Sequence, residues 1–151
     1  MPPFAILGDG RSRLREMLHM VGEDRPINDA TVTDETLAED SPAGLLWREL
    51  RALPGVGRVT TSKLMAAKRP AIIPVIDQHV ERLLEAPKAG FWVPMRHAMV
   101  EDGHLVEAVL TAADIGPGVT PLRAADVVVW LHAHGRQWLP DHLRGVAGPD
   151  C

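Results

Sequence analysis

The sequence contains a single cysteine, Cys151, among its 151 residues. A lone thiol excludes a disulfide within the chain, and so little cysteine is typical of proteins from a reducing compartment. The sequence also lacks an apolar run of membrane-spanning length and a basic-then-apolar leader. From these absences we expect a cytoplasmic protein that does not enter a membrane.

The signals of β-structure and of repetition are missing as well. No segment alternates apolar and polar residues as a half-buried strand does, and there is no internal repeat or low-complexity tract. Thirteen prolines divide the chain into segments of helix length, and 46% of the residues are hydrophobic, enough to form a core. We therefore predict one compact all-α domain over residues 1–151, ending in a loose tail from about residue 139 to residue 151.

Apolar spacing predicts the individual helices. They are expected at residues 11–21, 43–52, 58–68, from 77, at 104–113 and from 121, with a short helix near 34–39 capped by Thr33 and a separate aromatic segment at 91–99. The segment from Val127 to Leu131 is apolar on all sides, which predicts that the last helix is buried at the centre of the fold.

Basic residues are outnumbered by acidic ones, and they are concentrated in one region. The net charge is −4, an unusual balance for a protein that binds DNA at physiological salt. The first 49 residues carry ten acids and five bases, whereas residues 51–76 carry five bases and no acid. The sign of the charge therefore changes where a Leu-Pro-Gly-Val-Gly turn begins.

This turn, at residues 53–57, joins two predicted helices. Gly55 and Gly57 allow positive φ and let another backbone approach closely. Glycines that lead into a helix leave backbone N–H groups pointing outward, with the helix dipole behind them. This combination favours a phosphate-binding hairpin. A structural helix–turn–helix with a solvated basic face fits the same pattern.

Asp77 stands at the other end of this region. Pro70 and Pro74 end the preceding helix, and an apolar connector at residues 72–76 leads to Asp77. Apolar residues at helical spacing follow, so Asp77 is placed as a helix N-cap. The same carboxylate, kept ionised by backbone N–H groups beside a pocket, could stabilise positive charge developing on a sugar. The sequence is compatible with both roles.

Two stretches together resemble the helix-hairpin-helix/Gly-Pro-Asp superfamily of DNA glycosylases. They are Leu53-Pro54-Gly55-Val56-Gly57-Arg58-x-Thr60 and Pro74-Val75-Ile76-Asp77-Gln78-His79-Val80-x-Arg82. In that superfamily the hairpin holds the backbone of damaged DNA, and an Asp beyond its second glycine assists cleavage of the N-glycosidic bond. Gly57 and Asp77 have the matching separation, and the resemblance covers residues 43–86, the expected hairpin core. The stretches KLMAAKRPAIIPVID and LRAADVVVW also resemble an uncharacterised bacterial group of domains of unknown function.

The superfamily resemblance implies DNA as the partner and assigns roles to individual residues. Contacts to the DNA backbone would come from Gly55, Val56, Gly57, Arg58, Thr60, Lys63, Lys68 and Arg69. Asp77 would be the catalytic residue. Candidates for the base pocket are Trp92, His79 and Arg123. Alternatively, Trp92 is a core residue, and Arg123 pairs with the nearby Asp126.

Two departures from the superfamily limit the chemistry that the resemblance implies. Bifunctional members carry a Lys two residues past the second hairpin glycine, where this chain has Val59. A Schiff base needs an amine, so we expect no strand cleavage. Some members bind an iron–sulfur cluster through four cysteines, which a chain with only Cys151 cannot do. The resemblance allows a monovalent cation at the hairpin and implies no other cofactor.

Seven histidines raise the question of a metal site, with His132 and His134 close together in the sequence. Residues two apart on a helix do not share a face, and no Asp, Glu or Cys completes a known ligand spacing. We therefore expect no metal site.

The leading interpretation is a monofunctional DNA N-glycosylase-like protein, in which a base leaves the stack and enters a pocket beside Asp77. One alternative is a non-catalytic DNA-binding module in which Asp77 only caps a helix. Another is a repurposed scaffold that acts on a small molecule or a protein partner, which the acidic net charge favours.

Overall fold

The computed structural model describes residues 8, 10–83 and 90–134. Its elements are α1 (Gly10–Met20), the short 3-10 helix η2 (Glu35–Leu37), α2 (Pro42–Arg51), α3 (Arg58–Lys68), α4 (Gln78–Leu83), α5 (Trp92–Ala112) and α6 (Pro121–Ala133). No strand occurs in these residues, so the prediction of a compact all-α domain is confirmed. The expected tail at residues 139–151 lies outside the described residues.

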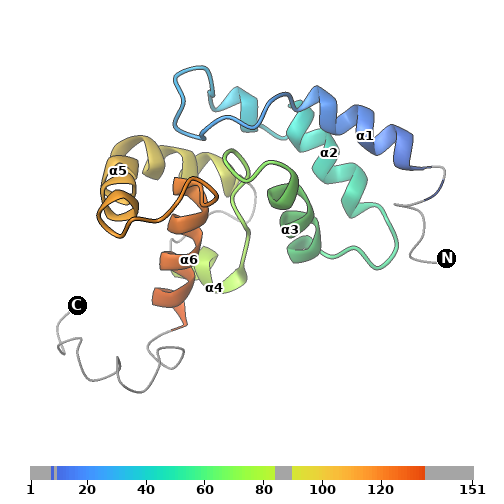
Figure 1. Ribbon diagram of the computed structural model, residues 1–151. Coiled ribbons are helices and arrows are strands. Elements are labelled where there is room, and N and C mark those ends of the chain that lie inside the picture. The colour runs from blue at the N-terminus through green and yellow to red at the C-terminus, as the bar shows by residue number, and fades with distance from the viewer. Residues whose placement is uncertain (1–7, 9, 84–89, 135–151) are drawn as a thin grey trace.

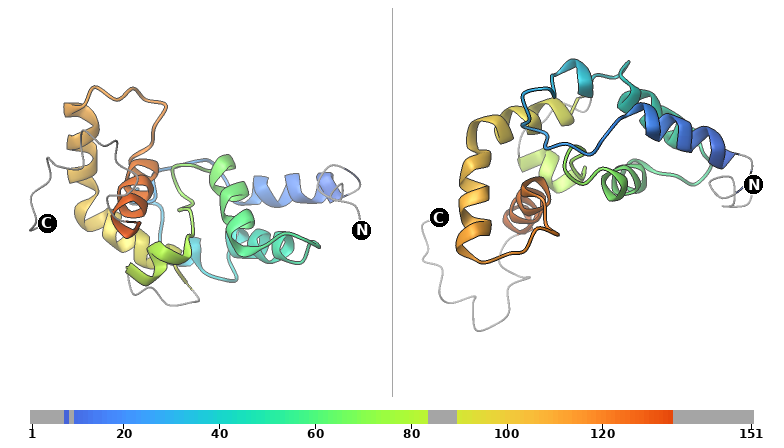
Figure 2. Two further views of the ribbon diagram at one scale, coloured as in Figure 1. Left: turned by 90° about the horizontal axis from the view of Figure 1, so that it is seen from below. Right: turned by 45° about the horizontal axis from the view of Figure 1, so that its top comes forward.

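The helices form two groups with an irregular segment between them. At one end α1 lies along α2, and at the other end α5 packs against α6 (Figures 1 and 2). The helix α3 contacts α2, and α4 contacts α6. Residues 69–77 run between α3 and α4 through the middle of the molecule, so this connector touches both groups (Figure 1).

The core lies around this connector. Ile72, Ile73 and Ile76 are almost fully buried, as expected for an apolar segment between two prolines. They belong to one cluster with buried side chains from α2, α3, α5, α6 and the segment before η2, including Ile27, Val32, Leu46, Leu50, Met65, Met95, Met99 and Leu122. Burying so much of the connector fixes the position of Asp77, which follows it directly.

Local signals explain where several helices begin. Ser41 caps α2 by accepting a bond from the Gly44 N–H at 3.2 Å, and Pro42 follows it at the first helical position. Thr120 and Pro121 begin α6 in the same way, as the sequence predicted. A Cβ at Gly44 would lie 2.3 Å from the Glu39 carbonyl oxygen, so only glycine lets the chain before α2 pack this closely.

The structure corrects three of the predicted elements. The short helix near 34–39 is the 3-10 turn η2, with Asp34 rather than Thr33 at its N-cap position. The aromatic segment and the helix at 104–113 form one helix, α5, of 21 residues. Gly103 interrupts the apolar pattern there, but it is buried against Asn28, where a Cβ would come within 3.1 Å of the amide nitrogen. Close packing, and not a helix end, accounts for this glycine.

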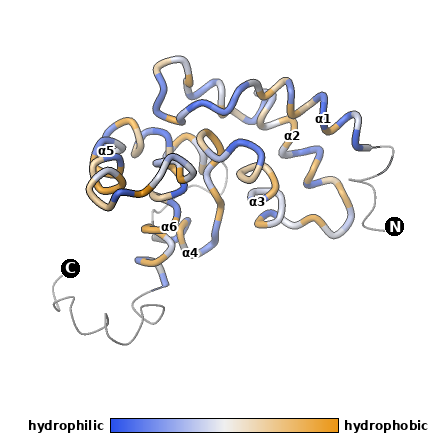
Figure 3. The backbone as a smooth tube through the Cα atoms, viewed as in Figure 1, coloured by the Kyte–Doolittle hydropathy of each residue, from blue (hydrophilic) through white to orange (hydrophobic). Residues whose placement is uncertain are grey.

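The third correction concerns α6. Hydrophobic residues occur along much of this helix (Figure 3), and the sequence predicted burial on every side. Leu122 and Ala125 are buried, but Val127 and Val128 are 56% and 62% exposed. The helix therefore covers the core with one face, and the described residues leave the opposite face uncovered.

Candidate functional site

The turn between α2 and α3 contains two glycines with different conformations. Gly55 has a φ of +78°, so it uses the conformational freedom that glycine allows. Gly57 has φ −79° and ψ 172°, which any residue can adopt, so it does not use that freedom. Gly57 is instead the N-cap of α3.

The start of α3 is open on its outer side. The N-cap Gly57 has no side chain to bond the N–H groups of the first turn, and a Cβ built at Gly55 or Gly57 would meet nothing within 4 Å. These N–H groups lie at the positive end of the helix dipole, an arrangement that suits an anion. The geometry is therefore compatible with the predicted phosphate contact.

The hairpin is less suited to the monovalent cation that the resemblance allowed. Such an ion would bind carbonyl oxygens of the turn. The carbonyl of Val56 already accepts a bond from the Arg51 guanidinium at 3.1 Å, and that of Leu53 accepts the Val56 N–H at 3.1 Å. The Arg51 guanidinium thus already brings positive charge against the turn, which disfavours a second cation there.

The predicted basic residues do not form one group. Lys63 is exposed on α3, as is Thr60 near the hairpin. Arg58 instead turns toward α4 and forms an ion pair with Glu81, in which Nη1 lies 2.6 Å from Oε2. Lys68 is ten residues beyond Arg58, which places it about 15 Å along the helix axis from the hairpin.

Arg69 is held by backbone carbonyl groups at the end of α1. Its Nε donates to the Gly22 carbonyl at 2.7 Å and its Nη2 donates to the Leu18 carbonyl at 3.1 Å, which satisfies the carbonyl end of α1. A guanidinium held by backbone groups at the far end of α3 cannot serve the hairpin. Of the predicted cations, Lys63 is therefore the one that stays both exposed and near the turn.

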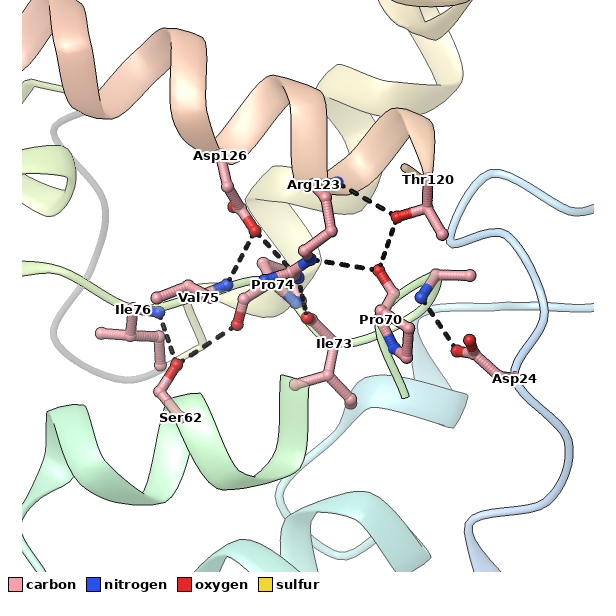
Figure 4. A network of polar contacts seen from close by, with 11 residues as sticks. Asp24, Ser62, Pro70, Ile73, Pro74, Val75, Ile76, Thr120, Arg123 and Asp126 are labelled. Carbon is pink, nitrogen blue, oxygen red and sulfur yellow. Dashed lines mark hydrogen bonds and ion pairs between the residues drawn. The ribbon is translucent and has the colours of Figure 1, made fainter. Parts of the chain in front are cut away.

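Polar side chains from three parts of the chain hold the connector that leads to Asp77 (Figure 4). Ser62 of α3 accepts the Ile76 N–H at 2.6 Å and donates to the Pro74 carbonyl at 3.3 Å. Asp24 accepts the Ala71 N–H at 2.9 Å. Because the connector is irregular and buried, these bonds replace those that a regular element would form.

Arg123 and Asp126 of α6 complete this network. Asp126 accepts the Val75 N–H at 3.1 Å and pairs with Arg123 at 2.8 Å, and Arg123 donates to the carbonyls of Pro70 and Ile73. Burial raises the pKa of Asp126 to about 6, since it outweighs the lowering effects of Arg123 and of the Val75 N–H. The pairing considered from the sequence is confirmed. The Arg123 guanidinium holds the connector, and Arg123 is not among the residues that line the pocket described next.

A cavity of about 300 Å³ lies between the start of α2, the start of α3, the end of the connector and the start of α5. Its walls include three aromatic side chains, those of Trp47, Phe91 and Trp92. The rings of Trp47 and Trp92 meet edge to face with centroids 5.5 Å apart. Trp92 is 7% exposed, so it is both a core residue and a wall of the pocket. Aromatic walls of this kind suit a planar, mostly apolar ligand.

Asp77 lies beside this cavity but outside its lining. The connector residue before it, Ile76, is part of the wall, as is Arg58. The carbonyl of Asp77 accepts the Glu81 N–H at 2.9 Å, which makes Asp77 the N-cap residue of α4. Asp77 is half-buried. The side chain of His79, the remaining pocket candidate, lies outside the described residues.

Several residues of the site were not identified from the sequence. Trp47 follows the apolar spacing of α2, so its position resembled that of an ordinary core residue. Phe91 was recognised only as part of an aromatic segment. Ser62 had no distinguishing feature, because a serine within a helix shows its partner only once the connector is folded against it.

The described residues contain no group of three or more His, Cys, Asp or Glu side chains that could hold a metal ion. None of the helices in this part of the chain combines the length and apolar character that crossing a membrane requires.

A comparison with protein families finds one match, to a family of unknown function (DUF6308), over residues 2–133. Since the match covers well over half of the chain, the protein belongs to this family. No curated protein and no solved structure matches the chain. The description of the family states no activity, so a function can be proposed only from the residues and their arrangement.

Proposed function

We propose that this protein binds DNA through the hairpin and acts as a monofunctional N-glycosylase, with Asp77 as the catalytic residue. The hairpin would hold a phosphate at the open start of α3. A base turned out of the duplex would enter the aromatic pocket, and water would replace it on the sugar. The protein would leave the strand intact, because Val59 occupies the position where an amine would be needed.

The observation that carries this proposal is the position of the aromatic pocket, next to the start of α3 and the end of the connector. Trp47, Phe91 and Trp92 form its walls, while Arg58 from the first turn of α3 and Ile76 at the end of the connector form its other side. A base in this cavity would therefore be flanked by the hairpin helix and by the residue next to Asp77. Stacking on aromatic rings is a general way to hold a base outside the duplex.

The carboxylate of Asp77 would act on the sugar at the mouth of the pocket. When the bond from the sugar to the base breaks, its electron pair leaves with the base and positive charge develops on the sugar. A fixed negative charge nearby stabilises that state, and water then adds to the sugar carbon and loses a proton, which the departed base takes up. The connector places this charge, since Ser62 holds Ile76 and Asp126 holds Val75.

The test compares base release by wild-type protein and by Asp77→Asn from duplexes that each carry one damaged base. Asn retains a capping oxygen, so thermal unfolding and DNA affinity should change little. Removing the charge should lower the rate of base release by roughly a hundredfold or more, equivalent to about 3 kcal/mol. Asp102→Asn, an exposed change on α5, is the matched control and should retain the wild-type rate. Equal rates for wild type and Asp77→Asn would refute the catalytic role.

A second candidate is a non-catalytic DNA-binding module. It is favoured by the observation that Asp77 is the N-cap of α4 and lies outside the pocket lining. In that case wild-type protein would bind duplex DNA and release no base from any of the substrates. The same experiment therefore separates the two candidates.

A further inference from the structure

A second cavity, also of about 300 Å³, lies in a groove between α1, α2 and α3, away from the hairpin. Its floor consists of apolar side chains, those of Leu14, Leu18, Leu46, Leu50, Leu64 and Met65. Leu46 and Leu50 are 3% and 6% exposed, but Leu64 is 38% exposed. The groove therefore presents an apolar surface that the described residues leave partly open.

The helix α1 shows the same incomplete packing. Its apolar residues Leu14, Met17 and Leu18 lie against the core and are only partly buried. However, no residue of α1 is buried: α1 packs along α2, and the groove lies between α1 and α3. A ligand in the groove would cover this apolar face.

Three cations stand at the rim of this groove: Arg11 and Arg15 on α1, and Lys68 on α3. All three are exposed, and none of them pairs with an acid in the part of the chain that the structure describes. Their neighbour Arg13 differs, because its guanidinium contacts Glu49 of α2 at 3.1 Å. Uncompensated positive charge around an apolar floor attracts an anion that also has an apolar part.

We propose that this groove binds a small anionic amphiphile, with its apolar body on the leucine floor and its anionic head at the rim. The size of the cavity is that of a site for a single small molecule. The charge of the rim selects the sign of the head group. The chain as a whole has a net charge of −4, so three cations with no acid partner among the described residues make this groove a local exception.

Nucleic acid is a poorer fit to the same surface. DNA-backbone contacts are made by polar and charged groups, and a floor of leucines offers them no partner. The groove also lies toward the far end of α3, where Lys68 is separated from the hairpin by nearly the whole length of the helix. The groove is therefore independent of the proposed phosphate site.

The test uses dodecanoate below its micellar concentration, with binding to the intact chain measured by calorimetry. Dodecyltrimethylammonium has the same tail and the opposite charge, and it is the control ligand. We expect wild-type protein to bind dodecanoate roughly tenfold or more tightly than the cation, because only the anion gains from the rim. Absence of dodecanoate binding, or equal affinity for the two ligands, would overturn the proposal.

Two variants locate the site. Arg11→Gln combined with Arg15→Gln should weaken dodecanoate binding roughly tenfold and leave thermal unfolding unchanged, since both side chains are exposed. Leu64→Gln should lower the affinity for both ligands, because it places an amide in the apolar floor. The matched control is Arg82→Gln, which neutralises an exposed arginine on α4 and should leave dodecanoate affinity unaltered.

A DNA-binding assay on the same proteins tests the competing interpretation, in which the cations at the rim bind nucleic acid. If the groove serves the amphiphile, the double arginine variant retains wild-type affinity for a short duplex. If that variant instead loses DNA affinity while dodecanoate binding stays as in the wild type, the rim belongs to a nucleic-acid surface and the proposal fails.

Discussion

Gly57 offers a way to place a charge beside the proposed phosphate site without disturbing the turn. It is an N-cap in extended backbone, with open space where a side chain would begin. Asp and Asn are both favoured N-caps and nearly identical in size, so they differ here only in charge. Gly55 does not allow this experiment, because its positive φ would strain any other residue.

We therefore expect Gly57→Asp to weaken binding to a short duplex roughly tenfold or more, and Gly57→Asn to weaken it much less, since only Asp repels a phosphate. Both variants should unfold at or above the wild-type temperature. Fluorescence anisotropy with labelled duplex at two salt concentrations measures the affinities. Wild-type affinity in both variants would show that the hairpin does not hold phosphate.

At the scale of elements, the connector between α3 and α4 is the central feature. It is irregular and buried, and its backbone groups are bonded by Ser62 of α3, by Arg123 and Asp126 of α6, and by Asp24. Asp126 is an acid buried in this network, so it makes stability depend on pH. Burial raises the pKa of its carboxylate to about 6, above the value of about 3.9 in an unfolded chain.

The sign of this dependence follows from the raised pKa. A group with a higher pKa in the folded state contributes stability that is fully present below its unfolded pKa and is lost as the pH rises through its folded pKa. Asp126 should therefore lower the free energy of unfolding between about pH 4 and pH 6, by at most about 3 kcal/mol.

Asp126→Asn removes this titration and can keep the bond from the Val75 N–H. The free energy of unfolding, measured with denaturant at pH 4.5 and pH 7.5, should fall less with rising pH in the variant than in the wild type. If the free energy of unfolding changes with pH equally in the wild type and in the variant, Asp126 ionises as it does in water.

At the scale of the whole molecule, the positive charges are divided among separate surfaces. Lys63 is exposed near the hairpin, Lys68 stands at the rim of the groove, and Arg58 is paired with Glu81. A DNA contact through the hairpin would then depend largely on backbone N–H groups. Such a contact neutralises few phosphates, so its affinity should depend weakly on salt.

The positions of the lysines also predict whether the protein can cut the DNA strand. The chain contains three lysines, Lys63, Lys68 and Lys88, and none occupies the hairpin position of Val59. We expect borohydride to trap no covalent complex between this protein and abasic DNA, as judged by gel electrophoresis. A bifunctional glycosylase serves as the positive control. Efficient trapping would identify an amine nucleophile and contradict the monofunctional assignment.

Local sequence pattern was enough to predict the class of the fold and the start of most helices. The absence of alternating segments, the prolines and the apolar spacing of the helices depend on neighbours along the chain, and they act before tertiary contacts exist. For the same reason the turn at residues 53–57 and the capping position of Asp77 were predicted from local pattern.

The packing partners of these helices and turns depend on tertiary contacts. Gly103 lies within α5 because it packs against Asn28, and Val127 looked buried until α6 was seen to cover the core with one face. The pairing of Arg58 with Glu81 and the bonds of Ser62 join residues far apart in the sequence. Such contacts depend on which surfaces the helices bring together, and local spacing carries no record of that choice.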